Sequence, residues 1–322
     1  MKIAHLTRFT SDKMIAYNGY GYATERILAS LRNTGYDLVE NDHTADASFW
    51  FEQPWRWVWG GDKYKIGYHP WESTLLLPDW PAMMNECDEI WTPSPLTAFW
   101  YKEYNDIKPP VYVYQHGVDS VWTTKERQVD DVVRFLHVGG EAVRKGMPTV
   151  LKAFRAAFQG TSNASYVALT CKMAERGYNL AHHSNVNVIA GPLPIEQLVS
   201  LHHDHHVFVY PSWGEGFGLN PIQAMATGMP TVSTYDWMPY SRFMDPALKV
   251  ESTFTDSPFS EHPGKMFKPD FDDLVDKMRY VVENYGTCSH YAVSTAGKLK
   301  MEYDWDLLTK NTFDALEKRL VM

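Results

Sequence analysis

One carboxylate, Glu215, lies in a glycine-rich segment (Pro-Ser-Trp-Gly-Glu-Gly-Phe-Gly-Leu-Asn-Pro) that directly follows a predicted buried strand at Val207–Tyr210. A helix is predicted next, with Asn220 as its N-cap, Pro221 as its first residue and Gly228 just after its end. Backbone N–H groups at such a helix start can hold a phosphate while Glu215 contacts a polar group beside it. An ordinary strand-to-helix turn, whose glycines serve only tight packing, is the alternative.

Two adjacent cations, Arg144 and Lys145, occupy a second loop of the same kind. This loop connects a predicted strand at Val132–Val138 to a predicted helix at Pro148–Phe158. Two cations at the mouth of a cleft suit a diphosphate, whose negative charge has to be offset if no metal does so. The alternative is a solvated pair of side chains near a helix start.

Weaker candidates lie in the N-terminal half and among the histidines. His69 and Glu72 follow a predicted strand at Lys65–Tyr68, where a histidine facing a cleft can act on a ligand, although a lone histidine is more often structural. Gly19 and Gly21 permit a close backbone approach, but the full GxGxxG pattern is missing. The run His202–His206 is interpreted as structural, because no third set of metal ligands is evident.

Strands and helices alternate along the chain, which predicts two doubly wound α/β domains with parallel sheets that face each other across a cleft. At 322 residues the chain exceeds the usual size of a single core. A polar stretch at residues 117–128 is predicted to connect the domains, which are expected at residues 1–120 and 129–305. The predicted elements of the first domain are strands near Ile3–Leu6, Ala47–Phe51, Lys65–Tyr68, Glu89–Trp91 and Val111–Tyr114, with helices at Ala23–Leu31 and from Pro95.

The whole chain resembles the retaining glycosyltransferases of family 4, which have the GT-B fold. The strongest match is the donor-site signature of that family, a Glu followed by Gly-Phe-Gly-Leu and, further on, by Ala-Met-Ala-x-Gly-x-Pro, here beginning at Glu215. The segments Tyr112–Asp119 and Tyr303–Trp305 resemble the end of the first domain and the last signature of the family. The resemblance implies that a helix from about residue 306 to 322 packs back on the first domain.

The resemblance also implies roles for individual residues. Glu215 and His69 are expected to contact the donor sugar and to be catalytic. The remaining donor-binding positions are expected to be Gly19, Gly21, Arg144, Lys145, Gly216, Phe217, Gly218, Leu219 and Gln223. Two positions depart from the family pattern: Gln223 replaces the second Glu, and Gly140 replaces an Arg of the phosphate loop. An amide can still accept a hydrogen bond from a ribose hydroxyl.

The predicted activity is therefore transfer of a sugar, with retention, from a nucleotide diphosphate sugar to the hydroxyl of a glycan, lipid, protein, small molecule or modified nucleobase. No cofactor or metal is expected, because two adjacent cations and a helix N-terminus are already predicted to face the phosphate site. A nucleotide-sugar epimerase with the same fold and a non-catalytic nucleotide-sugar binder are the two alternatives, the second motivated by Gly140 and Gln223.

Composition limits the partners. The net charge is −9, and a nucleic-acid binder usually has a basic face, so duplex DNA is disfavoured as a partner, though not excluded. No apolar run is long enough for a transmembrane helix, and the first residues are too polar for a signal peptide. The three cysteines are far apart in sequence, which favours reduced thiols and a cytoplasmic location.

Overall fold

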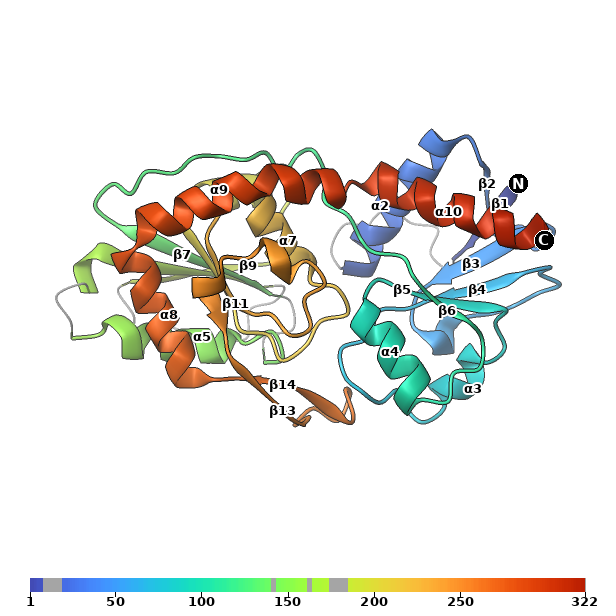
Figure 1. Ribbon diagram of the computed structural model, residues 1–322, viewed down its shortest axis with the longest axis horizontal. Helices are drawn as coiled ribbons and strands as arrows, with labels where there is room; N and C mark the ends of the chain where they lie inside the picture. The colour runs from blue at the N-terminus through green and yellow to red at the C-terminus, as the bar shows by residue number, and fades with distance from the viewer. Residues whose placement is uncertain (8–18, 140–142, 161–163, 174–184, 322) are drawn as a thin grey trace.

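The computed structural model describes residues 1–7, 19–139, 143–160, 164–173 and 185–321. The chain forms two α/β halves side by side, each built on a six-stranded sheet whose strands all run parallel (Figure 1). Two doubly wound domains were predicted from the alternation of strands and helices, and that fold class is confirmed. In the described part of the chain, no helix is both long and apolar enough to cross a lipid bilayer.

The first sheet has the strand order β2-β1-β3-β4-β5-β6. Its strands are β1 (Lys2–Leu6), β2 (Asp37–Glu40), β3 (Ala47–Phe51), β4 (Lys65–Tyr68), β5 (Glu89–Thr92) and β6 (Val111–Val113). All five residues of β3 are buried, as expected for a central strand that is covered on both faces. The short strand β2 lies at the sheet edge and is half exposed, so it lacked the apolar run by which the other strands were predicted.

Among the described residues, the helices that accompany the first sheet are α2 (Gly19–Thr34), α3 (Trp80–Met84), α4 (Pro95–Tyr104) and α10 (Trp305–Val321). The start of α4 follows the predicted rule, because the Ser94 side chain accepts a hydrogen bond from the Leu96 N–H and Pro95 occupies the first turn. Helix α10 comes from the far end of the sequence and lies beside α2 (Figure 1). Its Phe313 and Leu316 are buried in the core of the first half.

The second sheet has the order β12-β11-β10-β7-β8-β9. Its strands are β7 (Val133–Gly139), β8 (Val167–Met173), β9 (Val186–Ala190), β10 (Val207–Tyr210), β11 (Thr231–Thr234) and β12 (Lys249–Val250). The helices of this half are α5 (Met147–Phe158), α6 (Ile195–His203), α7 (Leu219–Ala226), α8 (Phe271–Glu283) and α9 (Tyr285–Glu302). Strands β7 and β10 and helix α5 lie within one residue of their predicted positions.

The start of α7 differs from the prediction. Gly218, with φ 88°, is the N-cap, and the helix begins at Leu219. The predicted cap, Asn220, is inside the helix, where its side-chain amide donates a hydrogen bond to the Val138 carbonyl at 3.0 Å. A left-handed glycine turns the chain into the helix two residues earlier than the predicted Asn220 cap.

An antiparallel hairpin that was not predicted joins the two halves. Strands β13 (Ser252–Asp256) and β14 (Lys265–Pro269) extend below the second sheet in Figure 1. The Thr74 N–H donates to the Lys265 carbonyl at 3.1 Å, and the Lys265 N–H donates to Thr74 Oγ1 at 2.8 Å. The Leu75 N–H donates to the Pro263 carbonyl at 3.3 Å. The hairpin end is therefore bonded to the loop that follows β4.

Candidate functional site

A cavity of about 1250 Å³ lies between the two halves, at the carboxyl ends of strands from both sheets. Its first wall includes residues that follow β3 and β4 and residues of α2. Its second wall includes residues of the loop after β7, the last residues of β8, and residues that follow β9 and β10. Ligands of doubly wound folds bind at this end of the strands. The cavity is therefore the candidate site.

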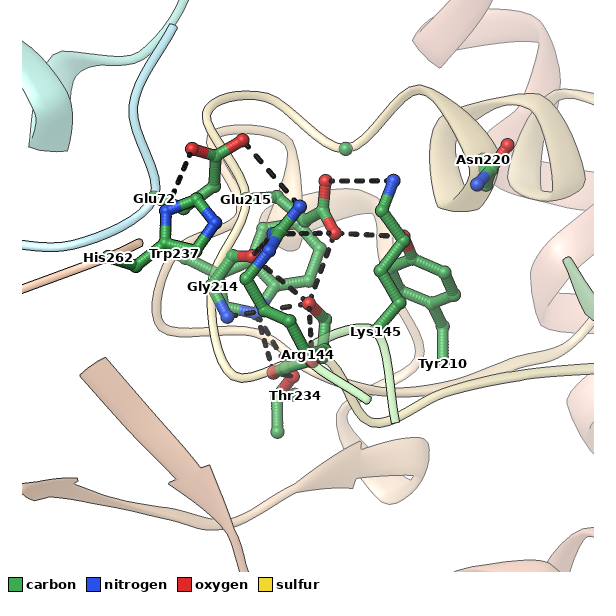
Figure 2. A network of polar contacts seen from close by, with 12 residues as sticks. Glu72, Arg144, Lys145, Tyr210, Gly214, Glu215, Asn220, Thr234, Trp237 and His262 are labelled. Atoms are coloured by element: carbon green, nitrogen blue, oxygen red, sulfur yellow. Dashed lines mark hydrogen bonds and ion pairs between the residues drawn. The ribbon is translucent and has the colours of Figure 1, made fainter. Parts of the chain in front are cut away.

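Glu215 is fixed at the centre of a buried network (Figure 2). Its Oε1 accepts hydrogen bonds from the Tyr210 hydroxyl at 2.9 Å and the Ser212 hydroxyl at 3.1 Å. Arg144 Nη1 donates to the same oxygen at 3.3 Å, and Lys145 Nζ lies 3.7 Å from Oε2. Glu215 also lines the cavity, so its carboxylate is held in one orientation at the wall of the site.

The two cations of the β7–α5 loop are placed differently. The Arg144 side chain is 4% exposed and donates to the Gly214 carbonyl, while its Nη2 lies 3.7 Å from Glu72 Oε1. Its charge is thus shared by two carboxylates, one from each half of the protein. The Lys145 side chain is 19% exposed and also lines the cavity. The role predicted for both residues at a diphosphate stays a prediction, and of the two Lys145 is the more accessible.

The glycine-rich loop lies directly against the first half of the chain. A Cβ on Gly216 would lie 2.5 Å from Pro70 Cβ and 2.9 Å from the Trp71 nitrogen, so this position has no room for a side chain. The loop residues Gly216, Phe217, Gly218 and Leu219 line the cavity, as does Gln223 of α7. These five predicted donor-site residues are therefore brought together at one wall.

Helix α2 is at the opposite wall of the cavity. Gly19 lines the cavity and is the first residue of α2, and Gly21 lies in the same helical turn. Tyr20, between them, also lines the cavity and was not singled out from the sequence. Gly140, the departure from the family pattern in the phosphate loop, lies outside the described residues.

His69 is placed behind Tyr20. It is 1% exposed, and its Nδ1 is 3.0 Å from the Tyr20 hydroxyl. Its ring packs against Trp71 and Trp80, with centroids 5.7 and 5.0 Å away. Burial lowers the pKa of His69 to about 3, so the ring is neutral at physiological pH. The contact with the donor sugar predicted for His69 stays a prediction, and it is Tyr20, its hydrogen-bond partner, that lines the cavity.

The histidine run near the end of α6 makes internal contacts. His202 Nδ1 lies 2.8 Å from the Leu198 carbonyl, and His205 Nδ1 lies 2.6 Å from the Leu201 carbonyl. His206 Nδ1 accepts a hydrogen bond from the Arg134 N–H at 2.9 Å. Within the described ranges, no group of three or more His, Cys, Asp or Glu side chains is arranged to hold a metal ion.

Several residues of the site were not found by sequence reasoning. Tyr210 and Ser212 orient Glu215. His262 Nδ1 lies 3.6 Å from Glu72 Oε2, and both of these residues are labelled in Figure 2. Ser212 and Tyr210 could have been found from the sequence, because they lie only three and five residues before Glu215. His262 could not, because it comes from the hairpin, far away in the sequence. The three cysteines are all buried and unpaired.

Comparison with known proteins agrees with this arrangement. Residues 132–240 match the family model for group 1 glycosyl transferases. A sucrose-phosphate synthase from Thermosynechococcus elongatus has a similar structure, with a TM-score of 0.71 and 12% identity over 99% of each chain. Anabaena HepE, solved in complex with UDP and glucose, gives a TM-score of 0.70 and 12% identity over 99% of this chain and 100% of that chain.

Comparison with curated protein sequences gives no match. At 12% identity the solved structures show that the fold is shared and nothing more. The family model covers residues 132–240, which include Glu215 and the loop around it. The two-domain architecture matches the GT-B fold of these solved structures, and residues 132–240 match the model of group 1 glycosyl transferases.

Proposed function

We propose that the protein is a metal-independent, retaining glycosyltransferase that moves a sugar from a nucleoside diphosphate sugar to an acceptor hydroxyl. The observation that carries the proposal is the fixed carboxylate of Glu215. Its Oε1 accepts from Tyr210 and Ser212 and faces Arg144, at the wall of a cavity shared by both domains. The family match over residues 132–240 supports the reaction class.

The diphosphate would lie against the second domain. Lys145 and the backbone N–H groups at the start of α7 offset the negative charge that develops on the leaving diphosphate. Arg144 is buried between carboxylates, so its task in this proposal is to hold Glu215 in place.

The sugar would lie beside Glu215, which accepts hydrogen bonds from its hydroxyls as the ring becomes oxocarbenium-like. The bond between the anomeric carbon and the phosphate oxygen breaks, and the acceptor oxygen bonds to that carbon from the same face. The proton of the acceptor hydroxyl passes to the leaving phosphate. Retention is taken from the family resemblance.

A donor screen tests the proposal. UDP-, GDP-, ADP- and dTDP-sugars are each added to the purified protein, and the unfolding temperature is recorded. A ligand at about 100 times its Kd stabilises a protein by about 2.7 kcal/mol, which is a shift of several degrees. UDP-sugars come first, because HepE was solved with UDP.

Product analysis with the best donor completes the test. Release of the nucleoside diphosphate with transfer of the sugar to an acceptor or to water is the expected result. An isomerised sugar that stays on the nucleotide would identify an epimerase instead. Binding without any turnover across a broad set of acceptors would identify a non-catalytic binder.

A further inference from the structure

The first wall of the cavity carries an exposed indole. Trp55, in the 3-10 helix Pro54–Arg56, lines the cavity and is 49% exposed. Trp71 and Trp80, which line the same cavity, are only 4% and 5% exposed. An indole left open at a cavity wall offers a flat apolar surface with no internal packing role to account for it.

The Trp55 ring is held in place. Its Nε1 donates to Gln53 Oε1 at 2.6 Å, and the Arg56 guanidinium lies 4.7 Å from the ring centroid. Arg56 Nη1 in turn bonds to Glu52 Oε2 at 3.1 Å. A ring that is already ordered loses little conformational freedom when a ligand stacks on it.

A chain of side-chain contacts connects the segment around Trp55 to the network at Glu215. The 3-10 helix packs against α3, and Trp80 of α3 contacts Trp71, with ring centroids 4.8 Å apart. Trp71 contacts His262 at 5.0 Å, and His262 reaches Glu72, which is linked through Arg144 to Glu215. The wall thus leads from an open indole to the proposed reaction centre.

The size of the cavity leaves room for a second ligand. Small-molecule sites usually measure about 300–1000 Å³, and this cavity of about 1250 Å³ exceeds that range. The donor-site loops lie on the second wall, so the additional space belongs to the side with Trp55, Gln53 and Glu72.

The chemistry of this wall favours an uncharged polyhydroxyl ligand. Arg26 and Arg56, the cations on this side of the cavity, are each paired with carboxylates, so they offer little attraction for a phosphate backbone. Gln53, Glu72 and Glu261 supply oxygen acceptors for hydroxyl groups, and the Trp55 ring suits the apolar C–H face of a sugar.

We infer that the acceptor is a neutral carbohydrate, one sugar of which stacks on Trp55 while its hydroxyls bond to the side chains of Gln53 and Glu72. The inference rests on the proposed function because it identifies the bound carbohydrate as the acceptor of sugar transfer. Carbohydrate binding at this site is tested separately from transfer.

The experiment uses the full chain on an array of immobilised neutral glycans, in the presence of the nucleoside diphosphate that gives the largest thermal shift. The best glycan is then titrated calorimetrically against wild type, Trp55→Ala and Trp55→Phe. Phe99→Ala is the matched control, because Phe99 is an aromatic residue that is 52% exposed on α4. A dT oligonucleotide and phosphatidylglycerol-containing vesicles serve as competing probes.

We expect Trp55→Ala to weaken glycan binding by about tenfold or more, the scale of one lost aromatic contact, and Trp55→Phe to weaken it less. Phe99→Ala should bind as wild type does. Failure of wild type to bind any neutral glycan, equal binding by wild type and Trp55→Ala, or preference for the oligonucleotide or the vesicles would overturn the inference. Trp55-dependent glycan binding without consumption of any nucleotide sugar would support the subsite and contradict the proposed transfer.

Discussion

Arg144 Nη1 lies 3.3 Å from Glu215 Oε1, and both side chains are buried, at 4% and 8% exposure. Arg144 is also 3.7 Å from Glu72 of the other domain, so one guanidinium connects the proposed sugar-binding carboxylate to the opposite wall. Two cations offset the charge of Glu215, Arg144 at Oε1 and Lys145 at 3.7 Å from Oε2, and Arg144 is the more deeply buried of the two. The site is therefore a single electrostatic unit that spans the cleft.

Replacement of Glu215 tests its role in the reaction. We expect Glu215→Ala to lower the transfer rate by about two to three orders of magnitude, the scale for loss of a positioned electrostatic group. Binding of the nucleoside diphosphate should change little. Steady-state kinetics and calorimetry measure the two quantities, and Glu215→Gln separates the charge from the shape. A Glu215→Ala variant with near-normal kcat would remove Glu215 from the mechanism.

Arg144 and Lys145 are expected to differ in their effect on stability. Arg144→Met leaves two carboxylates without their shared cation, and breaking a buried pair in this way costs about 3–5 kcal/mol. Lys145→Met removes a partly exposed cation with one carboxylate at 3.7 Å, and we expect a loss of about 1 kcal/mol or less. Urea unfolding of the two variants gives the comparison. Equal losses would mean that the buried pair is not what holds the loop.

Lys145 is expected to act through the diphosphate. Lys145→Met should weaken binding of the nucleoside diphosphate far more than binding of the bare nucleoside, since the lost contact is to phosphate. Calorimetry with both ligands measures the difference, and wild-type protein at raised salt is a useful reference. The same loss for both ligands would contradict a phosphate contact.

Gly218 tests the backbone at the start of α7. Its φ is 88°, and a Cβ at this position would lie 2.5 Å from Trp237 Cζ3 and 2.7 Å from the Tyr240 hydroxyl. Gly218→Ala should destabilise the protein by about 1–3 kcal/mol from backbone strain, with the steric clash in addition. Gly297→Ala is the control: nothing lies within 4 Å of its Cβ inside α9, so it should stabilise by about 0.5–1 kcal/mol. Thermal unfolding of both variants measures the two changes in stability. A Gly218→Ala variant as stable as wild type would contradict the strain expected at this position.

Buried histidines predict a loss of stability in acid. Burial lowers the pKa to about 3 for His69, His116 and His202 and to about 4 for His5 and His137. Because the unfolded histidine titrates near 6.5, the unfolded chain binds more protons between that pH and the folded pKa. These histidines therefore do not reduce the free energy of unfolding above about pH 6.5. Below that pH each of them lowers it by up to about 1.4 kcal/mol per pH unit.

The measurement is the free energy of unfolding in urea at several pH values between neutral and mildly acidic. His116→Phe should reduce the slope, because His116 is packed among aromatic rings such as Phe51 and Phe217 and would no longer take up a proton on unfolding. A slope that is the same in this variant and in wild type would show that His116 is not among the titrating groups.

The sequence predicted the elements better than it predicted the contacts of the site. Apolar runs such as Val207–Tyr210 identify strands because both faces of a parallel sheet are covered. The hairpin was missed because its strands are polar and half exposed. The pairing of Arg144 with Glu72 depends on how the two domains meet, and the contact of His69 with Tyr20 depends on how α2 packs beside β4. Neither arrangement can be predicted from a local sequence pattern.

The last helix has a consequence for the order in which the protein can fold during synthesis. Helix α10 completes the core of the first domain, and Arg319 bonds to the buried Glu89 of β5 through two hydrogen bonds of 2.8 and 3.1 Å. The ribosome makes residues 1–113 first, yet this domain lacks one of its core helices until residues 305–321 have emerged. The second domain, made in between, can reach its native state while the first still awaits its final segment. A nascent chain released before α10 would leave the Glu89 carboxylate without its cation and Phe313 missing from the core.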